Sequence, residues 1–135
     1  MKSYTDIEQS EKLAEILPLE SADMCYIKHA TSDNLNWEFN EDFPPMILGN
    51  VPINELTVEA LPCWSLATLL SLIPQEIFDG EYIINITEGC VNRWVLTYDH
   101  FKNINHSYYS LSIGADNLID ACYKMILKLH ALKML

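Results

Sequence analysis

The sequence predicts an α+β domain made of two α-β-β repeats plus a final strand and helix, in a mostly antiparallel sheet with helices mainly on one face. Two segments, residues 17–27 and 73–83, share a pattern of identical residues at a constant separation. An apolar helical pattern precedes each segment and ends at its proline, and two stretches with strand periodicity follow that proline. A chain of 135 residues, half of them apolar, has the usual size of one domain, which we expect to span residues 1–135.

The internal repeat pairs residues 56 positions apart and covers about residues 5–42 and 62–99. A lone helix with two strands cannot bury its apolar face, so we expect both hairpins to lie in one sheet covered by both helices. We expect the repeated acidic residues to cap and charge the short turn before each hairpin. The identical pairs are Leu13 and Leu69, Pro18 and Pro74, Glu20 and Glu76, Asp23 and Asp79, Tyr26 and Tyr82, and Ile27 and Ile83.

A helix is expected to open each repeat. Thr5-Asp6-Ile7-Glu8 has the spacing of a capping box, which predicts a helix over residues 6–17. Residues 61–74 are apolar on almost all sides of a helix, which indicates a buried, central helix. Pro18 and Pro74 end the two patterns. The expected inward residues are Ile7, Leu13, Ala14, Ile16 and Leu17 in the first helix, and Trp64, Leu66, Ala67, Leu69, Leu70, Leu72 and Ile73 in the second.

Four strands are expected to follow the helices as two hairpins. In the first copy they are residues 25–30 and 36–40, joined by a polar loop. In the second copy they are residues 82–86 and 94–98, joined across Glu88-Gly89-Cys90. Alternate side chains share one face of a strand, so we expect Trp37 to lie on the same face as Phe39, and the matching Trp94 on the same face as Leu96. The two tryptophans could line a ligand groove or a partner surface, but core positions are the simpler interpretation at this period.

Residues 41–62, between the two copies, contain four prolines and are predicted to form an extended linker. Within it we expect an edge strand at residues 46–48 and a helical turn near residues 54–60.

Residues 107–135 are expected to close the domain with a strand and a helix. Tyr109, Leu111 and Ile113 alternate as in a strand, and Gly114 and Asp116 precede a helical pattern over residues 117–133. The expected inward residues of this helix are Leu118, Ile119, Cys122, Met125, Ile126 and Leu129, with Lys124, Lys128 and Lys133 on the outer side and toward the C-terminal end.

The net charge of −11 argues against nucleic acid as a direct partner. Residues 1–60 hold 12 acidic and 3 basic side chains, and the whole chain has only 8 basic against 19 acidic residues. Binding to phosphate backbones requires lysine and arginine, and an acidic surface is repelled by anionic membranes. The sequence shows neither a signal peptide nor an apolar run of about 20 residues. We therefore expect a cytoplasmic protein that binds no membrane.

Cys63 is the candidate nucleophile of this sequence. It follows Pro62 at the expected start of a helix, where the helix dipole and free amides lower the pKa of a thiol. His100 or His106 would be the base, and Asp99 would orient one of them. The spacing of the three residues does not itself indicate this set, and packing of Cys63 beside Trp64 and Leu66 is the simpler interpretation.

The sequence predicts neither a metal site nor a cofactor. The cysteines Cys25, Cys63, Cys90 and Cys122 form no C-x-x-C pair, which indicates reduced, buried thiols. Asp99, His100 and His106 lack the spacing of a ligand set, and surface histidines explain them better. Phosphate-binding glycine loops and the common hydrolase and zinc-protease motifs are also missing from the sequence.

The phrases "ILPLESADM" and "PCWSL" and the closing "DAC" helix are similar to those of a group of small uncharacterised proteins encoded in prophages and mobile elements of gut bacteria. The resemblance runs over nearly the whole chain, although residues 41–62 look expanded relative to the group. It implies no reaction, cofactor or catalytic residue. What it implies is a context, an accessory protein of a phage or mobile element that acts in a bacterial cytoplasm.

The leading functional hypothesis is a non-enzymatic module that binds another protein or itself. A second hypothesis is an acidic inhibitor that mimics nucleic acid, with the N-terminal half of the chain occupying the site of a host enzyme. A third hypothesis is a small cysteine-dependent enzyme that uses Cys63.

Overall fold

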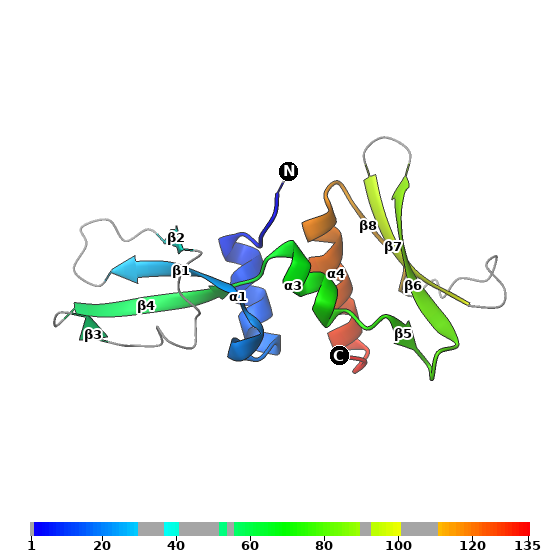
Figure 1. Cartoon of the computed structure of the whole chain (residues 1–135), viewed down its shortest axis with the longest axis horizontal. Coiled ribbons are helices and arrows are strands. Elements are labelled where there is room, and N and C mark those ends of the chain that lie inside the picture. Colours follow the sequence, from blue (N-terminus) through cyan, green and yellow to red (C-terminus); the bar gives the residue numbers. More distant parts are fainter. Residues whose placement is uncertain (1, 30–36, 41–51, 54–55, 90–92, 101–110) are drawn as a thin grey trace. The chain divides into compact units, whose positions relative to one another are not determined.

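The computed structural model describes residues 2–29, 37–40, 52–53, 56–89, 93–100 and 111–135 (Figure 1). They belong to two compact units, one formed by Tyr4–Thr68 and the other by Met1–Ser3 with Leu69–Leu135. Helices and antiparallel sheets occur in both, which confirms the α+β class. The prediction of one shared sheet is wrong, because the described strands pair in two separate four-stranded sheets. One domain over residues 1–135 stays a prediction.

The described residues of the Tyr4–Thr68 unit include helix α1, a 3-10 turn and an antiparallel sheet with the strand order β2-β1-β4-β3. Helix α1 packs against β4, next to the end at which β4 pairs with the first residues of β1. The elements are α1 (Ile7–Ile16), η1 (Leu19–Ser21), β1 (Met24–His29), β2 (Glu38–Asn40), β3 (Pro52–Ile53) and β4 (Leu56–Cys63).

Helix α1 begins one residue later than its sequence predicts. Asp6 is the N-cap, and its Oδ1 accepts from the Gln9 amide at 2.8 Å while Gln9 Oε1 accepts from the Asp6 amide at 3.2 Å. The capping box is therefore Asp6 with Gln9, not Thr5 with Glu8. Thr5 is unsuitable as a cap because its hydroxyl and carbonyl bind other groups of the unit.

The buried side of α1 differs in part from the expected stripe. Leu13 and Leu17 are buried as predicted, whereas Ala14 is exposed. The polar Gln9 and Ser10 are buried in its place. The helix ends as predicted at Pro18, with a last hydrogen bond from the Leu17 amide to the Leu13 carbonyl at 2.8 Å.

Strand β4 is the largest departure from the sequence prediction. The expected helical turn near residues 54–60 is wrong, because Leu56–Cys63 forms a strand that pairs with the whole of β1, from Met24 opposite Cys63 to His29 opposite Val58. This long-range pairing provides hydrogen-bond partners for the edge of β1 that faces β4, and it outweighs the local helical preference of the segment. The edge strand predicted at residues 46–48 lies outside the described residues.

The two faces of this sheet bury different residues. Tyr26, Leu61 and Cys63 form one apolar cluster, against which Trp37 packs, while Cys25 and Ile27 lie in another with Ala60. Phe39, predicted to share a strand face with Trp37, lies on the edge strand β2, where its ring stacks on Tyr4 at 4.1 Å and remains partly exposed.

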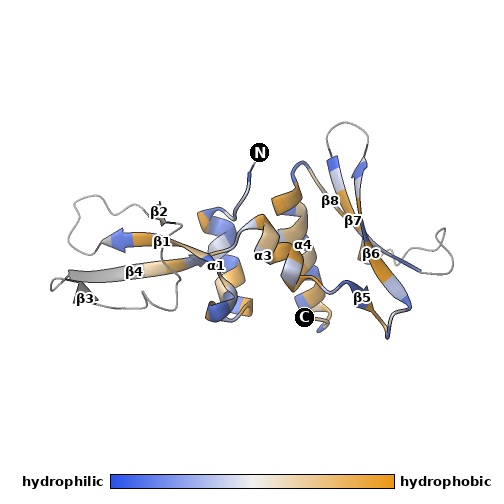
Figure 2. Cartoon of the chain, viewed as in Figure 1, coloured by the Kyte–Doolittle hydropathy of each residue, from blue (hydrophilic) through white to orange (hydrophobic). Residues whose placement is uncertain are grey.

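The other unit contains an antiparallel sheet with the strand order β5-β6-β7-β8. The predicted hairpin is confirmed and is longer than expected, since Glu88 and Gly89 pair with Trp94 and Arg93 instead of forming the turn. Figure 2 shows strongly hydrophobic residues along β6. The elements are α3 (Leu66–Leu72, which begins in the Tyr4–Thr68 unit), β5 (Glu76–Ile77), β6 (Tyr82–Gly89), β7 (Arg93–His100), β8 (Ile113–Ala115) and α4 (Leu118–Ala131).

Helix α4 matches its prediction closely. Asn117 is its N-cap and accepts from the Asp120 amide at 2.9 Å, and Lys2 Nζ lies 3.0 Å from Asp120 Oδ1. The helix packs on β7 and β8. Its fully buried residues are Ile119, Ala121, Cys122, Met125, Ile126 and Leu129, whereas Lys124, Lys128 and Lys133 are exposed as expected. Gly114, predicted to lead into the helix, lies in β8.

Helix α3 is shorter and less buried than predicted. It begins at Leu66, because Cys63 belongs to β4, and within it only Leu69 is buried, with Ile73 just beyond its end. The bond from the Ile73 amide to the Leu69 carbonyl is the counterpart of the one that ends α1. The strand orders of the two sheets differ, however. The internal repeat therefore stays a prediction.

Asp23, one of the repeated acidic residues, binds a segment distant from it in the sequence. Asp23 lies before β1, yet it accepts hydrogen bonds from the amide and the hydroxyl of Ser65, at 2.9 and 2.5 Å. Ser65 Oγ in turn accepts from the Thr68 amide, as an N-cap side chain does. The expectation that Asp23 caps its own turn is wrong, since it supports the start of α3.

This arrangement predicts that Asp23→Ala lowers the free energy of unfolding by about 1 kcal/mol, since it removes two acceptors from the α3 cap. The matched control is Glu20→Ala, which removes an exposed carboxylate three residues away and should change stability by less than about 0.5 kcal/mol. Urea denaturation of the three proteins measures the difference. Equal losses in both variants would contradict the assignment.

Candidate functional site

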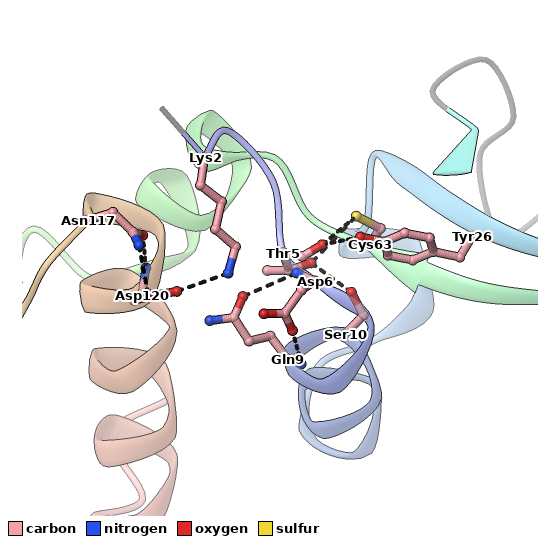
Figure 3. A network of polar contacts seen from close by, with 9 residues as sticks. All are labelled: Lys2, Thr5, Asp6, Gln9, Ser10, Tyr26, Cys63, Asn117 and Asp120. Carbon is pink, nitrogen blue, oxygen red and sulfur yellow. Dashed lines mark hydrogen bonds and ion pairs between the residues drawn. The ribbon is translucent and has the colours of Figure 1, made fainter. Parts of the chain in front are cut away.

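The polar residues of the Tyr4–Thr68 unit gather around Thr5, and Cys63 is among them (Figure 3). Thr5 lies just before α1, Ser10 lies in its first turns, Tyr26 lies in β1, and Cys63 and Trp64 lie at and after the end of β4. We call these five residues the Thr5 cluster. All are buried, and all but Tyr26 are without solvent exposure.

Backbone and side chain of Thr5 both bind the segment that follows β4. The Thr5 amide donates to the Trp64 carbonyl at 3.0 Å, and the Trp64 amide donates to Thr5 Oγ1 at 3.1 Å. The Tyr26 hydroxyl donates to the Thr5 carbonyl at 2.7 Å. The chain before α1 is thus joined to both central strands of the sheet.

The thiol of Cys63 completes the cluster. Thr5 Oγ1 lies 2.8 Å from Ser10 Oγ and 3.5 Å from Cys63 Sγ, and the thiol donates to the Thr5 carbonyl at 3.4 Å. Among the described residues, every buried side-chain nitrogen and oxygen has a hydrogen-bond partner. A cluster whose buried polar atoms already have partners has the character of a structural network.

The electrostatics of Cys63 disfavour a nucleophile. Burial raises the pKa of the Cys63 thiol, and the carboxylate of Asp23 acts in the same direction. Hydrogen bonds with Thr5, Ser10 and Tyr26 oppose this shift without reversing it. The expectation of a pKa lowered by a helix start is wrong, because Cys63 ends a strand.

The other buried thiols behave in the same way. Burial raises the pKa of Cys25 to about 11, with a smaller contribution from Cys63, and it raises the pKa of Cys122 to about 12. All three are buried, reduced thiols. They remain protonated at neutral pH, as expected of packed cysteines. Cys90 lies outside the described residues.

Asp99 and His100 lie at the end of β7, in the unit that does not contain Cys63. Asp99 accepts a hydrogen bond from the Asn85 amide group, and the His100 ring meets the ring of Tyr82 edge to face at 5.4 Å. Within the described parts of the chain, the Cys63 thiol contacts hydroxyl groups and the Thr5 carbonyl. The Cys63, His100 and Asp99 set stays a prediction, and His106 lies outside the described residues.

Neither a metal centre nor a membrane-spanning helix is found among the described residues. No group of three or more histidine, cysteine, aspartate or glutamate side chains there is placed to hold a metal ion. The described helices are also too short or too polar to span a bilayer.

Strand β6 was predicted from the sequence, but the exposure of its apolar side chains was not. Ile83 and Ile86 are 44% and 40% exposed, on opposite faces of the strand. Sequence periodicity identifies β6 as a strand, but whether its side chains are covered depends on which strands lie next to it. Helix α4 contacts β7 and β8, so that much of β6 lies beyond the helix.

Comparison of the chain with protein-family models, with curated proteins and with solved structures finds no match.

The Thr5 cluster predicts that Thr5→Val destabilises the protein by about 1–3 kcal/mol, because the Trp64 amide and Ser10 hydroxyl lose a buried partner. Thr5→Ser keeps the hydroxyl and is the matched control, which should lose only the contribution of one buried methyl, about 1 kcal/mol. Denaturation in urea compares the variants. A Thr5→Val protein as stable as the wild type would show that the hydroxyl is dispensable.

The buried, protonated state of Cys63 predicts slow alkylation. In folded protein at pH 8, iodoacetamide should leave Cys63 unmodified, whereas the same treatment in denaturant should modify it fully. Peptide mass spectrometry distinguishes Cys63 from the other cysteines. Modification at the same rate in folded and unfolded protein would restore Cys63 as a reactive thiol.

Proposed function

We propose that this chain is a non-enzymatic protein–protein interaction module that binds another protein through β6. The observation that supports the proposal is the exposure of apolar side chains on this strand, Ile83 on one face and Ile86 on the other. Single exposed apolar residues are ordinary on protein surfaces. Strand β6 has two, one on each face, and Phe78 is exposed a few residues before the strand, so exposed apolar side chains are concentrated around β6.

The chemistry of the interior is consistent with this proposal. The residues best suited to catalysis, those of the Thr5 cluster, are buried and bonded to one another. A nucleophile requires access to substrate and a thiolate form, and Cys63 has neither feature. The proposal therefore assigns the function to binding at the surface.

The biological context belongs to the proposal as well. The resemblance to proteins of prophages and mobile elements suggests an accessory protein that acts in the cytoplasm of a bacterium. Its partner would then be a protein of the host cell or of the element.

A second candidate function, an acidic inhibitor that mimics nucleic acid, is favoured by the outer side of α1. Glu8, Glu11 and Glu15 are all exposed and are spaced by three and four residues, which places them in a row along the helix. Such a row presents carboxylates at intervals comparable to those of phosphates. It predicts capture of a basic nucleic-acid enzyme that is released at modest salt concentration.

The test is a pull-down from nuclease-treated lysate of the host bacterium with three tagged proteins. Wild type should retain one stoichiometric protein, and Ile83→Ser with Ile86→Ser should lose at least about nine-tenths of it, because two apolar contacts are replaced by polar side chains. Leu19→Ser is the matched control, since Leu19 is also exposed but lies in the Tyr4–Thr68 unit.

The elution profile separates the possible outcomes. Equal retention by wild type and the double variant would contradict binding through β6. Release by modest salt, together with loss of binding in Glu11→Lys, would favour the acidic inhibitor. Recovery of the tagged protein alone would contradict both candidates.

A further inference from the structure

The outer edge of β6 is open over its second half. Strand β5 pairs only with the beginning of β6, through Ile77 opposite Tyr82 and Glu76 opposite Ile83. One further bond joins the Ile84 amide to the Gln75 carbonyl at 3.0 Å. Beyond Ile84, the described residues provide β6 with no neighbour on the side away from β7.

The direction of the free backbone groups follows from that last bond. The Ile84 amide points toward β5. Because the hydrogen-bonding direction alternates from residue to residue along a strand, the amide and carbonyl groups of Asn85 and Thr87 point toward β7. Ile86 and Glu88 therefore direct their amide and carbonyl groups outward. These four groups have the spacing needed to accept one more antiparallel strand.

The side chains at the same positions specify the chemistry of such a strand. Ile86 and Glu88 lie on one face of β6, opposite Leu96 and Trp94 of β7. Both are exposed, and within the described residues no ion pair involves Glu88. Residues directly opposite in an antiparallel pair interact, with opposite charges favourable and like charges unfavourable.

We propose that the open edge of β6 binds an extended protein segment with the order basic residue, any residue, apolar residue. In the antiparallel direction the basic side chain lies opposite Glu88 and the apolar one lies opposite Ile86. The net charge of −11 favours a basic partner over a second copy of this chain. This inference rests on the proposed function and names the partner of the same strand.

The probe is a blocked heptapeptide with Lys-Thr-Val at its centre, titrated into ¹⁵N-labelled protein and followed by NMR. We expect the amide signals of Ile86 and Glu88 to shift most. Two matched peptides serve as controls, one with Glu in place of Lys and one with the order reversed to Val-Thr-Lys. Each should bind about tenfold more weakly than the first, since cross-strand pairing of charges depends on sign and register.

Two variants separate backbone pairing from side-chain contact. Ile86→Pro removes the outward amide and leaves the pairing of β6 with β7 intact, because proline is tolerated where an edge amide faces solvent. It should abolish binding of the Lys-Thr-Val peptide, while Ile86→Val should retain it within about twofold. Glu88→Gln should remove the preference for Lys over Glu and leave the shifts in place.

Several results would overturn the inference. They are equal affinity for the Lys and Glu peptides, shifts confined to other residues, undiminished binding by Ile86→Pro, or failure of the peptide to bind. A concentration-dependent dimer of the unliganded protein that shifts the same amides would replace the basic segment with a second copy. If the inference fails while the pull-down still depends on Ile83 and Ile86, the proposed function stands and only its partner class is wrong.

Discussion

The two-way bond between Thr5 and Trp64 is the constraint on which the Tyr4–Thr68 unit depends. Because the Thr5 hydroxyl accepts from the Trp64 amide, it is not available to cap α1, and the cap falls to Asp6. The position of this N-cap then determines which side chains of α1 face the interior. Ser10 faces the Thr5 hydroxyl, and Leu13 and Leu17 follow on the buried side at the helical period.

The same constraint determines the surroundings of the Cys63 thiol. Tyr26 and Cys63 are bound to Thr5 from two adjacent strands, and burial keeps the thiol protonated although its hydrogen bonds act in the opposite direction. In the other unit, α4 covers β7 and β8 and leaves β6 exposed along its second half. The buried polar side chains have hydrogen-bond partners, whereas the backbone groups on the outer edge of β6 beyond Ile84 have no neighbouring strand among the described residues. This contrast is the physical basis of the proposed binding role.

Prediction from sequence succeeded where a pattern was long and local. The apolar stripe of α4 and the hairpin of β6 and β7 repeat their period over enough residues to identify both elements. It failed where a distant segment decides the outcome. The segment at residues 54–60 becomes a strand because β1 pairs with it, and Cys63 is buried because that strand continues to it. The open edge of β6 depends on strand order, which no local pattern contains.

Native-state hydrogen exchange of individual amides tests the central role of Thr5 most directly. If the Thr5 and Trp64 bonds hold the unit together, both amides should exchange only through its global unfolding, with the same free energy as amides in the middle of β1 such as that of Tyr26. Exchange of the Thr5 and Trp64 amides by local fraying, at a free energy well below that of Tyr26, would contradict the account.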